Sequence, residues 1–408
     1  MKIAPIIKAI KKHNGEVING DASLNDANGE KISYRLVHTG QHYDKNMSDT
    51  FFEELGIPAP DVNLGCGGGT QAEQTAHIMV AFEKELMEHP TDVVLVVGDV
   101  TSTMACSIVA KKLNTKVCHV EAGIRSWDLT MPEEINRMVT DSLADYMFTT
   151  SDVANRNLIR QGAVMMNDGM SEAKPLIDGM MPEDKYANQR VQQRVWHVGN
   201  VMIDTLLANR ARFRKPEVWD ELGLKPQEFV VMTMHRPANV DEENHLRAMM
   251  EQIIDNVHGL PVIFPIHPRT AKLLLGDRTA KGLQDASLQD ASKMLQERWP
   301  NLHIVEPMGY LEFNYLVERA KAVVTDSGGI TEETTVMGVP CITLRDNTER
   351  PETCTVGTNE LIGTDPRAIK PALDKLFAGE WKKGAIPELW DGHTAERIVK
   401  ILSALEIS

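Results

Sequence analysis

The sequence is poor in the features that mark several large classes of protein. Its 408 residues include five cysteines, none in a CxxC pair. An odd number of widely spaced cysteines argues against a disulfide framework or a zinc site, and it fits a reducing cytoplasm. No apolar run approaches the roughly 20 residues that cross a membrane. We therefore expect a cytoplasmic protein with no membrane partner and no metal. The cysteines are Cys66, Cys106, Cys118, Cys341 and Cys354.

Basic charge is also scarce. The chain has 43 Lys and Arg against 58 Asp and Glu, which gives a formal net charge of −15. Proteins that follow a phosphate backbone need a basic face, so this balance argues against a nucleic-acid partner and against an anionic membrane surface. A phosphorylated small molecule would have to be bound by a local basic site in an acidic protein.

Three common motifs of nucleotide and hydrolase chemistry are missing as well. There is no GxGxxG after a first strand, no GxxxxGK[ST] and no GxSxG. The glycine-rich segment GCGGGTQAEQ, residues 65–74, opens a helical stretch. It suits either an anion site or a mobile loop, and a mobile loop is the simpler interpretation.

The sequence does contain a regular alternation of apolar runs and helical stretches. The runs are continuous rather than alternating, which is typical of strands buried on both faces of a parallel sheet. The pattern predicts an α/β fold with two doubly wound, Rossmann-like domains. We expect an N-terminal domain over 1–199, a second domain over 200–380 and a C-terminal helix within 381–408. The runs include DVVLVVGD, TKVCHVEAG, ADYMFTTS, FVVMTMHR, LPVIFPIHPR, AVVTDSGG and PCITLRDN.

Polar side chains follow six of these predicted strands. Any one of them could simply begin a loop, but six together indicate a ligand site, because ligands of open α/β sheets bind outside the carboxyl ends of the strands. The His-Arg pair after FVVMTM suits a phosphate or a leaving group, or else a capped turn. These residues are Asp99, Glu121, His235, Arg236, His267, Arg269, Asp326, Ser327, Arg345 and Asp346.

The segment VVTDSGGITEE, residues 323–333, has the order of a strand, a glycine turn and a helix start. The first turn of a helix offers backbone N–H groups and the positive end of the helix dipole, and glycines let a ligand approach closely. The segment therefore predicts an anion site.

A set of motifs resembles the non-hydrolysing UDP-N-acetylglucosamine 2-epimerases over nearly the whole chain. The resemblance implies two Rossmann-like domains that face a cleft, as in glycosyltransferases of the B type, with the C-terminal helix crossing back to the first domain. It also implies a homodimer and a UDP-sugar substrate. The motifs are, in order, HTGQHYD, GDVTST, HVEAGIRS, MPEEINR, VGNVMIDTL, HRPANV, HPRT, GYLEF, TDSGGITEE and RDNTERPE.

The resemblance also assigns the residues that bind the substrate. The serine and glycines of TDSGG hold the diphosphate of UDP, Glu333 takes the ribose hydroxyls, and the residues around GYLEF frame the uracil. The arginine of TERPE adds positive charge at the phosphates. The implied substrate-binding residues are Lys2, Arg137, Arg236, Met308, Phe313, Ser327, Gly328, Gly329, Glu333 and Arg350.

The reaction that the resemblance implies is the reversible epimerisation of UDP-N-acetylglucosamine to UDP-N-acetylmannosamine, for surface polysaccharide precursors. The C2 hydrogen is not next to a carbonyl, so a base alone cannot remove it. In the family UDP is eliminated from C1, which leaves a glycal, and is then added back with the opposite configuration at C2. No cofactor is implied, because no net redox change occurs. By resemblance Asp99, Glu121 and Glu133 are the catalytic carboxylates and His235 assists at the leaving phosphate; which carboxylate serves which face stays open.

Two departures from the family pattern concern the beginning of the chain and a regulatory site. The family starts with a strand and a G-x-R-P-E turn, whereas this chain starts at MKIAPIIKAI, which matches the following helix. We expect Met1 not to be the natural start, and the chain as given to expose strand edges, melt low and epimerise little. A second, activating substrate site would retain Gln41 and His42, but Asp44 and GGGTQAEQ replace the rest, so we expect that site to be absent or altered.

Three alternatives remain. The substrate could be a related UDP-sugar such as UDP-diacetamido-glucuronate, since HTGQHYD and FFEELGIPAP are also similar to relatives that act on it. The chain could instead be a UDP-sugar-dependent glycosyltransferase, although the carboxylates of PEE and HVEAG favour an epimerase. It could also be a substrate-binding protein without activity.

Overall fold

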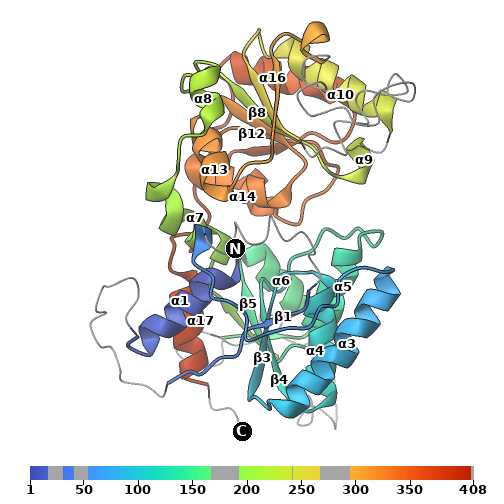
Figure 1. Cartoon of the computed structure of the whole chain (residues 1–408), viewed down its shortest axis with the longest axis vertical. Helices are drawn as coiled ribbons and strands as arrows, with labels where there is room; N and C mark the ends of the chain where they lie inside the picture. Colours follow the sequence, from blue (N-terminus) through green and yellow to red (C-terminus); the bar gives the residue numbers. More distant parts are fainter. Residues whose placement is uncertain (17–30, 41–53, 167–192, 241, 267–294, 406–408) are drawn as a thin grey trace. The chain divides into compact units, whose positions relative to one another are not determined.

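The computed structural model of the chain describes residues 1–16, 31–40, 54–166, 193–240, 242–266 and 295–405 (Figure 1). The chain divides into two compact units. Unit 1 comprises Met1–Ala208 and Glu388–Ser408, and unit 2 comprises Asn209–Pro387. Each unit is built around its own parallel sheet.

Unit 1 has a five-stranded sheet in the order β3-β4-β5-β7-β6, with every pair parallel. Its strands are β3 (Val93–Val97), β4 (Lys116–Val120), β5 (Tyr146–Thr149), β6 (Val164–Met165) and β7 (Arg194–His197). Its helices are α1 (Ile3–His13), α3 (Gln71–Glu88), α4 (Thr101–Lys112), α5 (Pro132–Leu143), α6 (Asp152–Arg160), α7 (Val201–Asn209) and α17 (Thr394–Ser403).

Helices cover both faces of this sheet. Its strands carry apolar residues on both sides, and these residues are buried against the helices. Val94 and Val96 of β3 belong to an apolar cluster with residues of α3 and α4. Leu95 points to the opposite face and packs against a second cluster, which contains Ile6 of α1 and Ile398 of α17. The C-terminal helix thus packs with the first helix of the chain (Figure 1).

A separate two-stranded sheet lies in the same unit. β1 (Val37–His38) pairs in parallel with β2 (Val62–Asn63), and Val37 is opposite Val62. β3 forms one edge of the five-stranded sheet, and no described strand pairs with its free side or joins it to β1.

Unit 2 has a six-stranded parallel sheet in the order β10-β9-β8-β11-β12-β13. In chain order this is 3-2-1-4-5-6, the arrangement of a dinucleotide-binding Rossmann sheet. The strands are β8 (Val230–Thr233), β9 (Val262–Pro265), β10 (Leu302–Val305), β11 (Ala322–Thr325), β12 (Cys341–Thr343) and β13 (Asn359–Leu361). The α-helices are α8 (Glu217–Glu221), α9 (Pro237–Val240), α10 (Glu243–Asn256), α13 (Tyr310–Arg319), α14 (Gly328–Met337), α15 (Pro351–Thr355) and α16 (Ile369–Phe377).

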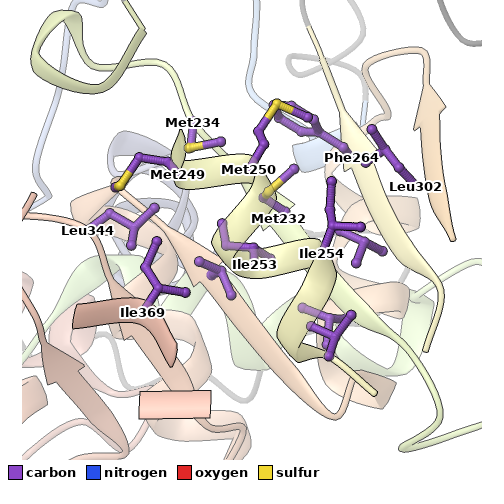
Figure 2. Close-up of a cluster of buried hydrophobic side chains, with 14 of the residues drawn as sticks. Met232, Met234, Met249, Met250, Ile253, Ile254, Phe264, Leu302, Leu344 and Ile369 are labelled. Carbon is purple, nitrogen blue, oxygen red and sulfur yellow. The ribbon is translucent and has the colours of Figure 1, made fainter. Parts of the chain in front are cut away.

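A methionine-rich core fixes one face of the second sheet. Figure 2 shows Met249, Met250 and Ile253 of α10 beside Met232 of β8 and Phe264 of β9, all completely buried. Flexible thioethers fill the irregular space between the helix and the strands. This packing holds β8, whose carboxyl end carries predicted site residues, in place.

The two sheets confirm the predicted fold class: an α/β chain with two doubly wound, Rossmann-like sheets. In the described part of the chain, no helix combines the length and the apolar character that crossing a membrane requires.

Candidate active site

The first cluster of polar residues lies in unit 2, at the point where the strand order of the sheet reverses. Thr233 ends β8 and Thr325 ends β11, and their hydroxyl oxygens are 2.6 Å apart. Ligands of open α/β sheets bind at such a point. Residues 235–236 and 326–327 follow these two strands, so the structure brings together two segments that the sequence singles out.

Asp326 organises this cluster. Its buried carboxylate accepts hydrogen bonds from the backbone N–H groups of His235 (3.0 Å) and Arg236 (2.9 Å) and from the amide of Asn239 (3.0 Å). His235 Nδ1 lies 2.8 Å from Asp326 Oδ1, while 63% of the His235 side chain is exposed. Burial alone would raise the pKa of Asp326, but His235 and the other donors hold it below its usual value. Asp326 thus orients an exposed imidazole that can contact a phosphate or carry a proton.

The predicted Ser-Gly-Gly turn begins α14. In the part of the chain that the structure describes, the N-cap residue Ser327 makes no side-chain capping bond. A side chain at Gly328 would meet Glu349 Oε1 at 3.1 Å and Arg345 Nη1 at 3.5 Å. Arg345 donates to Glu349 Oε2 at 2.5 Å, and Arg236 Nη2 is 3.9 Å from Glu349 Oε1. Two guanidinium groups therefore gather at a helix start, which suits a diphosphate.

Arg350 is placed differently from Arg345. Its guanidinium is buried, with Nε 2.5 Å from Oε1 of the buried Glu332. The assignment of Arg350 to the phosphates stays a prediction. Arg345 is the guanidinium that the geometry places beside Gly328.

Glu333, predicted to bind ribose, is buried one turn along α14. The hydroxyl group of Tyr310 on α13 donates a hydrogen bond to Glu333 Oε1 at 2.8 Å. Burial, with the charge of Glu332 nearby, raises the pKa of Glu333 to about 7. The predicted uracil residues Met308 and Phe313 are half-buried beside the apolar cluster on this face of the sheet. The Tyr310–Glu333 bond thus joins the segment predicted for the base to the residue predicted for the ribose.

The second cluster lies in unit 1, at the carboxyl ends of β3 and β4. Lys2 Nζ is 2.5 Å from Oε2 of the buried Glu121, and it lies 3.1 Å from the place that a side chain would take at Gly98. Glu121 has a φ of +72°, which is rare for a residue with a side chain. Strained backbone of this kind is concentrated at functional sites. Asp99 follows Gly98, so the two predicted carboxylates stand on neighbouring loops.

The helix α5 holds the Asp99 loop. Arg137 donates to Asp99 Oδ2 through Nε (3.0 Å) and Nη2 (2.5 Å), and to Glu134 Oε2 through Nη1 at 2.7 Å. Asn136 donates to the Asp99 carbonyl oxygen at 2.9 Å. Glu133 is exposed on the first turn of α5, whereas Glu134 is buried. The structure therefore pairs Arg137, predicted to bind substrate, with a predicted catalytic carboxylate.

Sequence reasoning missed several residues that build these clusters. Glu134, Asn136 and Tyr310 were not among the predicted site residues, and Asp326 and Arg345 were noted only as polar residues at strand ends. The spacing of Glu134 and Arg137, one helical turn apart, is the local signal that could have indicated their ion pair.

Some predicted features fall elsewhere. His267, Arg269, Gln41 and His42 lie outside the described residues. The glycine-rich segment 65–74 leads into α3 through a capping box, in which Thr70 and Glu73 exchange hydrogen bonds. No three His, Cys, Asp or Glu residues gather as a metal site within the described ranges.

Comparison with known proteins gives consistent results. The family described as UDP-N-acetylglucosamine 2-epimerase matches residues 25–403. A UDP-N-acetylglucosamine 2-epimerase of Methanocaldococcus jannaschii is 35% identical over 99% of this chain and 95% of its own. A UDP-2,3-diacetamido-2,3-dideoxy-D-glucuronate 2-epimerase of Pseudomonas aeruginosa is 34% identical over 82% of this chain and 81% of its own.

A solved structure is similar in fold. The crystal structure of the Methanocaldococcus jannaschii UDP-GlcNAc 2-epimerase, in complex with UDP-GlcNAc and UDP, superposes with a TM-score of 0.73 at 36% identity. The match covers 98% of this chain and 96% of that chain.

Proposed function

This chain belongs to the UDP-N-acetylglucosamine 2-epimerase family, and from that premise we propose that it interconverts UDP-N-acetylglucosamine and UDP-N-acetylmannosamine. The observation that carries the proposal is the pairing of two different chemistries in one chain. Unit 2 has cations and a helix start at its switch point, and unit 1 has carboxylates at its strand ends. A reaction that breaks and remakes a sugar–diphosphate bond needs both.

In the proposal, unit 2 binds UDP. The diphosphate binds to the first turn of α14 and to the guanidinium groups of Arg236 and Arg345. There it replaces the carboxylate of Glu349 as their partner or binds beside it. Glu333 takes the ribose hydroxyls, and residues near Tyr310 border the base. The exposed imidazole of His235, oriented by Asp326, contacts the leaving phosphate.

In the same proposal, unit 1 handles the sugar. The bond between C1 and the UDP oxygen breaks with its electron pair leaving on UDP, and a carboxylate removes the C2 proton, which yields a glycal. UDP then returns to C1 while a proton is delivered to the other face of C2. Asp99 and Glu121 are the proposed proton carriers, with Glu133 a third candidate, because positioned carboxylates can accept and return protons. Electrons balance without a redox partner.

One assay tests this function. UDP-N-acetylglucosamine is incubated with the protein in D2O, and the products are separated and analysed. We expect UDP-N-acetylmannosamine with deuterium at C2. Free UDP with a transferred sugar would favour a glycosyltransferase, and unchanged substrate would favour a binding protein.

The identity of the sugar is the finer question. The relative named for UDP-2,3-diacetamido-2,3-dideoxy-D-glucuronate is nearly as similar to this chain as the UDP-N-acetylglucosamine relative. We therefore keep that UDP-sugar as the second candidate. Competition between the two sugars in the same assay, read as the ratio of their kcat/KM values, decides between them.

We also propose that the protein is a cytoplasmic homodimer that supplies precursors for surface polysaccharide. The support for dimerisation is an apolar face of unit 1. Of the nine exposed large hydrophobic residues in the described part, Val80 and Met87 lie on α3, and Ile135 and Met138 lie on α5. A hollow of about 570 Å³ is lined by residues of α3, α4 and α5, among them Met79, Met104 and Ile135. Apolar patches of this kind mark protein interfaces, and a second copy would cover equivalent residues on both chains.

A further inference from the structure

A buried histidine connects the two loops that carry the proposed catalytic carboxylates. His119 lies on β4 and is fully buried. Its Nε2 is 2.8 Å from the carbonyl oxygen of Gly98, the residue before Asp99. Its Nδ1 is 2.7 Å from Oδ1 of Asp141 on α5.

The other oxygen of Asp141 reaches the second loop. Asp141 Oδ2 accepts a hydrogen bond from the backbone N–H of Gly123 at 3.0 Å, two residues after Glu121. It also lies 2.6 Å from Nη1 of the buried Arg125. One His–Asp pair therefore holds the backbone beside both Asp99 and Glu121.

The backbone at both ends of this network is held in an unusual conformation. Gly98, Glu121 and Gly123 have φ values of +75°, +72° and +77°. A side chain at Gly123 would come within 2.5 Å of the carbonyl oxygen of Ala154, so glycine is required there. Such conformations persist only where the surroundings enforce them. The buried pair contributes to that enforcement through Gly98 and Gly123, beside the backbone bonds of Glu121 and Ala122 to the Phe148 carbonyl oxygen.

Donor and acceptor roles identify the ring nitrogen of His119 that carries a proton. The Gly98 carbonyl can only accept, so Nε2 must carry a proton. Asp141 Oδ2 already accepts from Gly123, and although burial opposes ionisation, His119 and Arg125 lower the pKa of Asp141 below its usual value. His119 Nε2 is thus the donor that holds the Gly98 loop, and Asp141 joins His119 and Arg125 to the Gly123 loop.

We infer that His119 is a positioning residue of the epimerase: its imidazole, held between Gly98 and Asp141, sets the loops of Asp99 and Glu121 in the geometry for proton transfer. His119 itself touches no substrate in this inference. The inference rests on the proposed function, because it assigns a purpose to the two loops.

Three substitutions separate the two contacts. His119→Gln places an amide nitrogen near the position of Nε2 and can still bind the Gly98 carbonyl. His119→Asn places its amide nitrogen near Nδ1 and can bind only Asp141. His119→Phe keeps the volume and makes neither bond. His303→Phe changes a partly buried histidine of unit 2 and serves as the control.

We expect His119→Phe and His119→Asn to lower kcat by about 10²-fold, as small misplacements of catalytic groups do, with KM and UDP affinity nearly unchanged. His119→Gln should restore kcat to within about tenfold of the wild type, because it keeps the Asp99 loop in place. His303→Phe should have wild-type kcat. If all three His119 variants show the same fall in kcat, the same change in KM and the same fall in melting temperature, His119 has a structural role only, and the inference is overturned.

Nitrogen-15 NMR of histidine-labelled wild-type protein tests the contact with Gly98 without any activity. We expect Nε2 of His119, whose signal is identified by its loss in His119→Gln, to carry a proton at neutral pH, because it donates to the Gly98 carbonyl oxygen. An unprotonated Nε2 would overturn the inferred contact. If the wild type does not epimerise any UDP-sugar, the proposed function fails, and the NMR result still decides on the network. If His119→Phe does not fold, the comparison of Gln with Asn remains decisive.

Discussion

Glu121 illustrates at the residue scale how structure prepares a side chain for chemistry. Its backbone is left-handed, its side chain is buried, and its carboxylate is paired with Lys2. Asp99 is partly exposed and paired with Arg137. Each carboxylate is thus held in a fixed position beside a cation, which suits it to the proposed transfer of a proton to or from the sugar.

We predict that Glu121→Gln and Asp99→Asn each lower turnover by about 10²-fold or more, while UDP binding changes little. The amide keeps the size of the side chain and removes its ability to accept a proton. Deuterium incorporation at C2 of the sugar measures the lost step directly. Undiminished exchange in both variants would remove these residues from the proton-transfer role.

Glu333 leads to a prediction about pH. Its ordinary pKa of 4.5 is raised to about 7 in the folded protein, chiefly by burial. The folded state therefore holds this proton more tightly than the unfolded state, and stability should fall as pH rises from 4.5 to about 7. Glu333→Gln mimics the neutral acid and should escape this loss.

Urea unfolding of the wild type and Glu333→Gln at about pH 5 and about pH 8 measures the difference. From about pH 5 to about pH 8, the free energy of unfolding of the variant should rise by on the order of 3 kcal/mol relative to that of the wild type. A constant difference between the two proteins would mean that Glu333 titrates normally in the fold.

At the scale of single elements, the start of α14 is the feature on which UDP binding depends. Arg345 stands beside Gly328, whereas Arg350 is locked in a buried pair with Glu332. We predict that Arg345→Ala weakens UDP binding by roughly 2–4 kcal/mol, because a charge-assisted contact with the diphosphate is lost. Arg367→Ala, which removes a guanidinium that is 90% exposed, is the matched control and should bind UDP normally.

Arg350 allows a separate test of the same element. Removing one partner of a buried ion pair leaves the other charge uncompensated, at a cost of about 3–5 kcal/mol. We therefore expect Arg350→Ala to lower the free energy of unfolding, measured by urea denaturation. If stability is unchanged while calorimetry shows weaker UDP binding, Arg350 contacts the phosphates directly, as the family resemblance implies.

At the scale of the whole molecule, the exposed apolar residues of unit 1 bear on the proposed self-association. Ile135 is 48% exposed beside the apolar hollow of unit 1, and Ile386 is 54% exposed in unit 2. We predict that Ile135→Glu converts the proposed dimer to a monomer, because a carboxylate cannot be buried in an apolar interface without a partner. Ile386→Glu adds the same charge elsewhere and should remain dimeric. Sedimentation velocity at equal concentrations distinguishes the two, and a dimeric Ile135→Glu variant would place the interface on another surface.

Much of this organisation follows from the sequence alone. Continuous apolar runs specify strands that are buried on both faces, and the polar residues directly after them mark the ligand-binding edge of each sheet. The Asp326–Ser327 and His235–Arg236 pairs were identified in this way, since a residue that follows a parallel strand must emerge at that edge. Motif order was sufficient to indicate the family.

Tertiary structure alone decided which charged neighbour turns inward. Glu133 and Glu134 are adjacent in the sequence, yet a helix separates successive side chains by about 100°, so packing exposes the first and buries the second. Arg345 and Arg350 carry the same charge, and the fold sets one beside Gly328 and the other against Glu332. Contacts such as these join residues on different elements, and their energies depend on burial that no local pattern of residues specifies.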